Sequence, residues 1–342
     1  MHFVIGVTWS KGSVSQHFIA LGRELSARGH TVTIVADKHR RVEDPDLEVL
    51  AWPSGRPTRL RDARFLLRFV EARKPDCFIA NFSAASLMTA IGYLRNVPRR
   101  IVWYHSLLDA LPDSRKWRVY RRRGVFRLAT HVIPVSEAAK AEVIANYRVS
   151  PHRCLVHHLS LSDPGVMTHA RDRFLCVGHL HNKKGQDVLV RAVARAPGVQ
   201  VDFIGPGDSR SLMALARTLG VESRCRFIGL MDHASVVRAM GDGLATVIPS
   251  RMDNRPMVAI ESLAAGTPVL ASRVGGIPEI FRDGIDGYLV KPDDPDELAA
   301  KLIEMSAVKS EAMGAAARQY FLEHYEQRKV VTTQANWLEE LL

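Results

Sequence analysis

LATVIPSRMDNRPMVAIESLAAGTPVLAS, residues 244–272, places a helical segment between two short apolar segments, LATVIP (244–249) and PVLAS (268–272). The apolar segments have the length of buried strands, and Pro256 is suited to the first turn of a helix over 256–265. A strand, a helix and a second strand in this order form one unit of a parallel sheet. This stretch therefore predicts an α/β fold.

The same alternation of strand-length and helical segments extends along nearly the whole chain. In the first half, we predict strands at 3–8, 31–36, 47–51, 76–80, 100–104, 131–135 and 153–158. In the second half, we predict strands at 173–178, 199–205, 224–229, 244–249, 268–272 and 287–290. The helical segments between them would cover both faces of each sheet. The pattern predicts two doubly wound Rossmann-like domains.

A turn-rich stretch with few apolar residues, 159–172, interrupts this alternation near the midpoint. Because 342 residues exceed what one hydrophobic core usually organises, we place the domain boundary there. The predicted N-terminal domain covers 1–165 and the predicted C-terminal domain covers 166–342. We expect the two domains to face a central cleft and the last helices to cross back to the N-terminal domain.

Composition indicates a globular protein without a membrane span. Hydrophobic residues make up 46% of the chain and charged residues 24%, which excludes disordered and collagen-like classes. No apolar run approaches the roughly 20 residues that a membrane-spanning helix needs, and no basic segment of a signal peptide precedes the first apolar run. The four scattered cysteines indicate buried thiols in a reducing compartment. We expect a cytoplasmic protein.

The positive charge belongs to the first half of the chain. Residues 1–165 contain 26 lysines and arginines against 14 aspartates and glutamates, whereas 166–342 contain 21 against 22. A solvated basic face explains such an excess, and the one-sided charge also suits an anionic partner: phosphate-bearing lipid headgroups, a polyanionic saccharide or nucleic acid. Nucleic acid is disfavoured, because no zinc-finger spacing or RNA-binding aromatic motif is present. Much of the excess lies in Arg56, Arg59, Arg61, Arg64 and Arg68, and in Arg115, Lys116, Arg118, Arg121, Arg122, Arg123 and Arg127.

Two carboxylates follow the strand predicted at 244–249. Ligands of parallel sheets bind beyond the carboxyl ends of the strands, where Asp253 lies in the loop and Glu261 in the next helix. Asn254 is a candidate cap for that helix, whose free N–H groups would suit a phosphate. Glu261 could accept two ribose hydroxyls and Asp253 a sugar hydroxyl. Alternatively, the two carboxylates lie on a solvent-exposed face of the protein and bind no ligand.

Three further segments follow predicted strands. In GHLHNKKG (178–185), Lys184, or less favourably Lys183, could stabilise a departing diphosphate, whereas His179 and His181 make a poor metal site. The small-residue loop at Gly12 and Ser13 lacks the Walker and dinucleotide-binding patterns. His105, at the end of the strand predicted at 100–104, could hydrogen-bond a ligand or lie buried and satisfied.

Several segments in fixed order carry a resemblance to a known family. They are KGSVSQH (11–17), VGHLHNKKGQDVLVRA (177–192), VDFIGPGD (201–208), RCRFIGL (224–230) and DNRPMVAIESLAAGTPVLASRVGGIPEI (253–280). Together they resemble the family-4 retaining glycosyltransferases of the GT-B fold, also called glycosyltransferase group 1. The last segment is similar to that family's signature of two carboxylates separated by seven residues.

The resemblance implies roles for individual residues. It implies catalytic roles for His105, Lys184 and Asp253. It implies donor binding by Gly12, Ser13, His179, Lys184, Arg251, Asp253, Asn254, Pro256, Met257, Val258 and Glu261. The chain departs from the family pattern at Asp253, where glutamate is usual, at His179, where arginine is usual, and at Leu159-Ser160, where an Asn-Gly turn is usual.

The resemblance also implies a reaction. We expect a retaining, metal-independent enzyme without a cofactor that moves a sugar from a nucleoside diphosphate-sugar to a saccharide or lipid-linked acceptor in surface-glycan or glycoconjugate biosynthesis. The basic first domain would hold the acceptor and contact an anionic membrane peripherally. Two alternatives remain open: a sugar-nucleotide epimerase on the same scaffold, and a non-catalytic saccharide-binding homologue.

Overall fold

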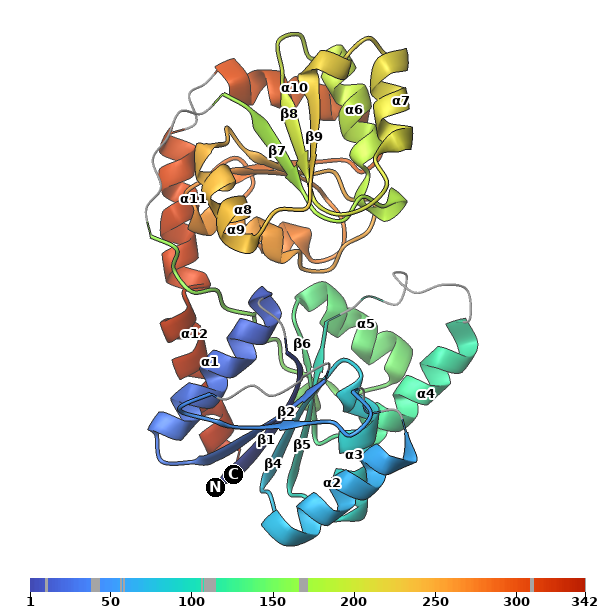
Figure 1. The fold of residues 1–342 in the computed structure, drawn as a ribbon, viewed down its shortest axis with the longest axis vertical. Coiled ribbons are helices and arrows are strands. Elements are labelled where there is room, and N and C mark those ends of the chain that lie inside the picture. The colour runs from blue at the N-terminus through green and yellow to red at the C-terminus, as the bar shows by residue number, and fades with distance from the viewer. Residues whose placement is uncertain are drawn as a thin grey trace. The chain divides into compact units, whose positions relative to one another are not determined.

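The computed structural model describes residues 1–9, 12–37, 44–55, 57, 59–105, 107, 115–165, 172–307 and 311–341, without the side chains of 115–118. The chain divides into two compact units (Figure 1). The first contains 1–160 and 327–342, and the second contains 161–326. Ser10, Lys11, Arg56 and part of the predicted linker, 166–171, lie outside the described residues.

The first unit is a parallel sheet in the strand order β3-β2-β1-β4-β5-β6. Its strands are β1 (His2–Thr8), β2 (Thr31–Asp37), β3 (Glu48–Ala51), β4 (Cys77–Asn81), β5 (Arg99–Tyr104) and β6 (His131–Pro134). Its helices are α1 (Ser13–Ala27), α2 (Leu60–Arg73), α3 (Ala84–Leu94), α4 (Arg115–Leu128), α5 (Glu137–Tyr147) and α12 (Gln327–Glu340). Val4 of β1 packs with α2 and α3, whereas its neighbour Ile5 lies near Gly22 of α1. The alternation of side chains along a strand thus supplies both faces of the sheet.

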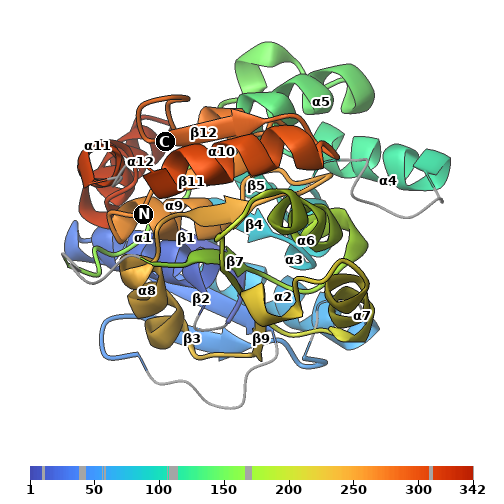
Figure 2. The same ribbon diagram turned by 90° about the horizontal axis from the view of Figure 1, so that it is seen from above.

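The second unit repeats this topology in the order β12-β11-β10-β7-β8-β9. Its strands are β7 (Phe174–Val177), β8 (Val201–Ile204), β9 (Cys225–Gly229), β10 (Thr246–Ile248), β11 (Val269–Ser272) and β12 (Gly287–Val290). Its helices are α6 (Gln186–Arg195), α7 (Arg210–Thr218), α8 (His233–Asp242), α9 (Met257–Ala264), α10 (Pro295–Ala307) and α11 (Glu311–His324). On one face, α6 and α10 lie side by side (Figure 2), and the other face carries α9 and α11.

The described strands confirm the predicted α/β class, with one exception. Strands β1 to β12 fall at twelve of the predicted positions. The prediction of a strand at 153–158 is wrong, because no strand forms there. Cys154 forms only an isolated bridge to Val132, because Pro151 begins a short 3-10 helix directly before it. All four cysteines are buried and none forms a disulfide. None of the helices in the described part of the chain is both long and apolar enough to cross a bilayer.

The last helix belongs to the first unit because its apolar stripe packs there. Val331, Gln334, Ala335 and Leu338 are buried at helical spacing, and α12 contacts α1. Arg28, which ends α1, pairs with Glu339 at 2.8 Å. Gln334 Nε2 donates to the carbonyl of His158 at 2.7 Å.

Removing the apolar anchor of α12 should destabilise the first unit. We expect Leu338→Ala to lower the free energy of unfolding by roughly 2–5 kcal/mol, because Leu338 is fully buried. Thr333→Ala, at an exposed position of the same helix, should change it by less than about 0.5 kcal/mol. Urea unfolding followed by circular dichroism measures both, and equal unfolding curves for the two variants would contradict this packing.

Candidate functional site

The second unit contains a cavity of about 310 Å³ at the carboxyl ends of β7 and β10. These two strands are neighbours at the point where the strand order reverses, which is where ligands of doubly wound sheets bind. Five segments of the chain line the cavity: Cys176–His179, Lys184 with Gln186, Val247–Ser250, Pro256–Val258, and Glu261. The sequence-predicted residues His179, Lys184, Pro256, Met257, Val258 and Glu261 therefore share one hollow.

Lys184 and Asp253 form an ion pair beside this cavity. Lys184 ends the short 3-10 helix that follows β7, and its Nζ donates to Asp253 Oδ2 at 2.6 Å. The other carboxylate oxygen of Asp253 accepts the backbone N–H of Asn254 at 3.0 Å. Asp253 is thus held in a fixed orientation, while the Lys184 side chain remains 36% exposed. An anion that enters the cavity would compete with Asp253 for the ammonium group.

Gly185 allows the two loops to approach this closely. Its φ of +65° is left-handed, and a Cβ atom at this position would lie 1.9 Å from the carbonyl oxygen of Pro249. Beside this contact, the backbone N–H groups of Arg251 and Met252 donate to the carbonyl of Lys183. A side chain at position 185 would separate the β7 loop from the β10 loop, and with them Lys184 from Asp253.

Glu261 lies in α9 and is 5% exposed. Its Oε1 lies 3.2 Å from Nε2 of His233, the first residue of α8, and the pKa of His233 is raised by this hydrogen bond. The start of α9 differs from the prediction. Pro256 occupies the N-cap position and the helix begins at Met257, so Asn254 is not the cap. The N-cap residue Pro256 makes no side-chain cap hydrogen bond to α9, and the first residues of this helix line the cavity.

The two arginines of this loop are engaged outside the cavity lining. The guanidinium of Arg251 pairs with Asp187 at 2.7 Å and with Asp293 at 2.6 Å, and the hydrogen bonds to Asp187 raise its pKa. Arg255 lies over the Tyr325 ring and donates to its hydroxyl at 2.8 Å. Donor binding by Arg251 and Asn254 stays a prediction.

The remaining predicted residues belong to the first unit. Gly12 is the N-cap residue of α1 and Ser13 is its first residue, beyond the carboxyl end of β1. His105 follows β5, and its Nε2 lies 2.9 Å from Asn81 Oδ1. The imidazole stacks on Phe82 at 4.4 Å, and burial lowers its pKa to about 3. His105 is therefore neutral at physiological pH.

Three residues of the second-unit site were missed by the sequence analysis. Gln186 Nε2 donates to the carbonyl of His179 at 3.1 Å and so shapes the loop after β7. Ser250 lines the cavity next to Asp253, and His233 contacts Glu261. His233 follows the capping residue Asp232, whose position after the strand predicted at 224–229 was an available signal. Over the described ranges, no three His, Cys, Asp or Glu side chains gather as a metal site would require.

Two family models match successive parts of the chain. Residues 14–159 match the model described as Glycosyltransferase Family 4, and residues 167–320 match the model described as Glycosyl transferases group 1. The two matches cover most of both units and the motifs around the cavity.

Curated relatives of similar sequence are D-inositol 3-phosphate glycosyltransferases. The protein from Mycobacterium marinum is 32% identical over 213 residues, which are 56% of this chain and 45% of the relative. The protein from Thermobifida fusca is 32% identical over 241 residues, which are 62% of this chain and 55% of the relative. The chain thus spans about half the length of the curated relatives it matches.

Solved structures resemble the whole chain. Sucrose-phosphate synthase from Thermosynechococcus elongatus superposes with a TM-score of 0.83 and 18% identity over 99% of this chain and 98% of that protein. Anabaena Alr3699/HepE in complex with UDP and glucose superposes with a TM-score of 0.83 and 16% identity over 99% of this chain and 100% of that protein. At these identities the likeness concerns the fold, and it confirms the predicted GT-B fold.

The contact between His233 and Glu261 makes a testable prediction about pH. In the folded protein, the pKa of His233 should lie above its ordinary value of 6.5 and return toward that value in Glu261→Gln. Because the pKa of His233 is higher in the folded than in the unfolded chain, its contact with Glu261 stabilises the fold fully at pH values below the unfolded-state pKa. This stabilisation is lost as the pH rises through the folded-state pKa of His233. Proton NMR titration of the histidine ring measures this, and an unchanged His233 pKa in Glu261→Gln would contradict the contact.

Proposed function

We propose that this chain, which belongs to the group 1 glycosyltransferases of family 4, transfers a sugar from a nucleoside diphosphate-sugar to an acceptor hydroxyl with retention of anomeric configuration. One observation carries the proposal. An ammonium group, a helix N-terminus and a buried carboxylate line the cavity at the carboxyl ends of β7 and β10. The ammonium group and the helix N-terminus both suit the diphosphate of the donor, and the carboxylate suits its ribose.

The diphosphate is assigned to Lys184 and the start of α9. The free N–H groups and the dipole of a helix N-terminus favour an anion, and Lys184 adds a full positive charge. Charge grows on the diphosphate as its bond to the sugar breaks, so both groups would stabilise the transition state more than the bound donor. Glu261, fixed by α9, would accept the ribose hydroxyls.

The sugar is assigned to Asp253, which is released from Lys184 when the diphosphate takes its place. The bond between the anomeric carbon and the diphosphate oxygen breaks, and the acceptor oxygen forms the new bond on the same face. The departing diphosphate oxygen takes the acceptor proton, so no protein nucleophile is required. Lys184 and the α9 N-terminus would supply the positive charge without a metal. From the first unit we assign Gly12, Ser13 and His105 to the sugar and the departing group.

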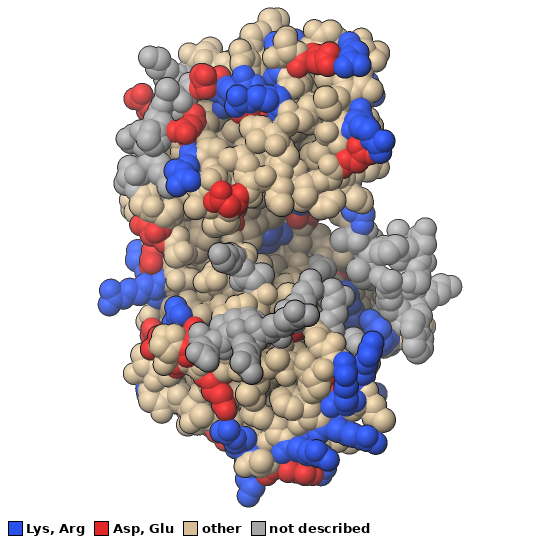
Figure 3. All heavy atoms as spheres, in the orientation of Figure 1, with Lys and Arg blue, Asp and Glu red and all other residues tan. Residues whose placement is uncertain are grey.

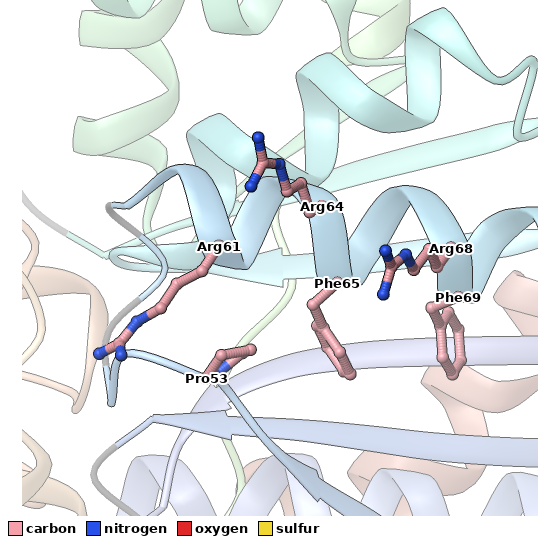
Figure 4. Close-up of a pocket in the computed structure, with 6 residues that line it drawn as sticks. All are labelled: Pro53, Arg61, Arg64, Phe65, Arg68 and Phe69. Atoms are coloured by element: carbon pink, nitrogen blue, oxygen red, sulfur yellow. The ribbon is translucent and has the colours of Figure 1, made fainter.

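The acceptor is assigned to the basic first unit. Lysine and arginine side chains gather over α2 and α4 (Figure 3). Along α2, Arg61, Arg64 and Arg68 line an open cavity of about 560 Å³ together with Phe65, Phe69 and Pro53 (Figure 4). A guanidinium stripe beside aromatic rings suits a phosphate attached to an apolar chain. This surface supports a lipid-linked acceptor and peripheral contact with an anionic membrane at the cytoplasmic face.

The donor assignment predicts a difference between adjacent lysines. Lys184→Ala should weaken nucleoside diphosphate binding at least tenfold and lower turnover further, because a charge at the leaving group is lost. Lys183→Ala, whose side chain does not line the cavity, should bind and turn over donor like wild type. Calorimetric titration and product analysis measure both. If the two variants behave alike, the assignment fails, and if donor alone is converted to an isomeric nucleotide-sugar, the enzyme is an epimerase.

The acceptor assignment predicts weaker membrane binding after charge reversal on α2. Each basic residue near an anionic surface contributes about 1 kcal/mol, so Arg64→Glu with Arg68→Glu should reduce sedimentation with phosphatidylglycerol vesicles by at least tenfold. A control with the same net charge, Arg210→Glu with Arg238→Glu, reverses exposed arginines of the second unit. Equal vesicle binding by the two double variants would rule out this surface.

A further inference from the structure

A second basic cavity lies in the first unit and shares no lining residue with the cavity along α2. It has a volume of about 330 Å³ and is lined by Arg123, Phe126, Arg127, Tyr147, Arg148, Val149 and Arg153. These residues come from the C-terminal half of α4, from the end of α5 with the two residues after it, and from the short 3-10 helix Pro151–Arg153. Helix α4 ends where β6 begins, so the cavity lies at the amino edge of the sheet. Gly12 and His105 follow strands at the opposite, carboxyl edge.

The four arginines of this cavity face no negative side chain. No acidic residue lines the cavity, and none of the four forms an ion pair with a carboxylate within the described residues. Arg123 Nε donates to the carbonyl of Asn146 at 2.8 Å, and Arg153 Nε donates to the carbonyl of Thr130 at 3.0 Å. Arg127 and Arg148 are exposed.

Helix capping explains the positions of two of the four arginines, but it does not neutralise the positive charge of the cluster. Arg123 and Arg153 bond carbonyl groups near the C-termini of α5 and α4, where the helix dipole favours a cation. A helix C-terminus carries roughly half an elementary negative charge, so two helix ends offset about one of four positive charges. Burial lowers the pKa of His131 nearby, and the charges of Arg99, Arg153 and His152 lower it further, as an uncompensated positive field would.

Two buried aromatic rings form part of the cavity wall. Phe126 and Tyr147 are buried and meet edge to face at 5.2 Å. The Tyr147 hydroxyl accepts a hydrogen bond from Arg122 at 3.1 Å, which fixes the ring from behind. Arg148 ends α5 in a left-handed conformation with a φ of +57°, which costs free energy for a residue other than glycine.

We propose that this cavity is a binding site for an oligophosphate, distinct from the donor site of the second unit. Guanidinium groups bind phosphoryl oxygens through paired N–H donors, and four of them from two helix ends and a 3-10 turn surround one hollow. A soluble oligophosphate bound there would link the ends of α4 and α5. The proposal does not depend on the glycosyltransferase reaction.

The test uses pyrophosphate as the probe and the full chain carrying Lys184→Ala, which weakens the donor site. Titration calorimetry at constant ionic strength should show one pyrophosphate bound in this background. Adding Arg127→Ser and Arg148→Gly should weaken that binding at least tenfold without unfolding the protein, because glycine relieves the left-handed strain at position 148.

A matched control separates the site from general charge loss. Arg238→Ser with Lys74→Gly also removes one exposed helical arginine, in α8, and one left-handed cap residue, Lys74, which has a φ of +44° at the end of α2. This control should retain pyrophosphate binding in the Lys184→Ala background. Equal affinities of the two double variants would overturn the proposal. It would equally be overturned if Arg127 and Arg148 were needed for binding to phosphatidylglycerol vesicles but not to pyrophosphate.

Discussion

The ion pair between Lys184 and Asp253 is the interaction on which the candidate site depends. It joins the loop after β7 to the loop after β10 at 2.6 Å, across the point where the strand order of the second sheet reverses. Gly185 permits the approach, since a Cβ atom would collide with the carbonyl of Pro249. The same two loops bring His179 and the start of α9 to the cavity. In the proposed reaction, this pair is exchanged: the diphosphate replaces Asp253 at Lys184, and Asp253 becomes available to the sugar.

The strands and the second-unit site could be predicted from the sequence because they depend on local patterns. Apolar runs of strand length identify β1 to β12, and the position of Lys184 and Glu261 after strands indicates a common edge. The strand predicted at 153–158 failed because apolar residues after a proline-initiated turn satisfy the pattern without a full ladder of backbone hydrogen bonds. The cap predicted at Asn254 failed because Pro256 itself takes the N-cap position.

Contacts between segments that are distant along the chain could not be predicted from the sequence. Arg251 has the charge expected of a phosphate ligand, but Asp187 and Asp293 approach it from other loops and engage its guanidinium group. His233 contacts Glu261 from the start of another helix, and no spacing along the chain predicts that contact. The basic segments were visible in the sequence as charge. Their separation into an aromatic surface on α2 and a cavity at the ends of α4 and α5 depends on how helices pack on the first sheet.

The central claim is that Asp253 and a diphosphate compete for the Lys184 ammonium group. The most direct measurement is the affinity of a nucleoside diphosphate without a sugar, determined by titration calorimetry for wild type and Asp253→Asn. The account predicts tighter binding to the variant, because the competing carboxylate is removed while Lys184 and the α9 N-terminus remain, together with loss of turnover. Equal or weaker binding to Asp253→Asn would contradict it.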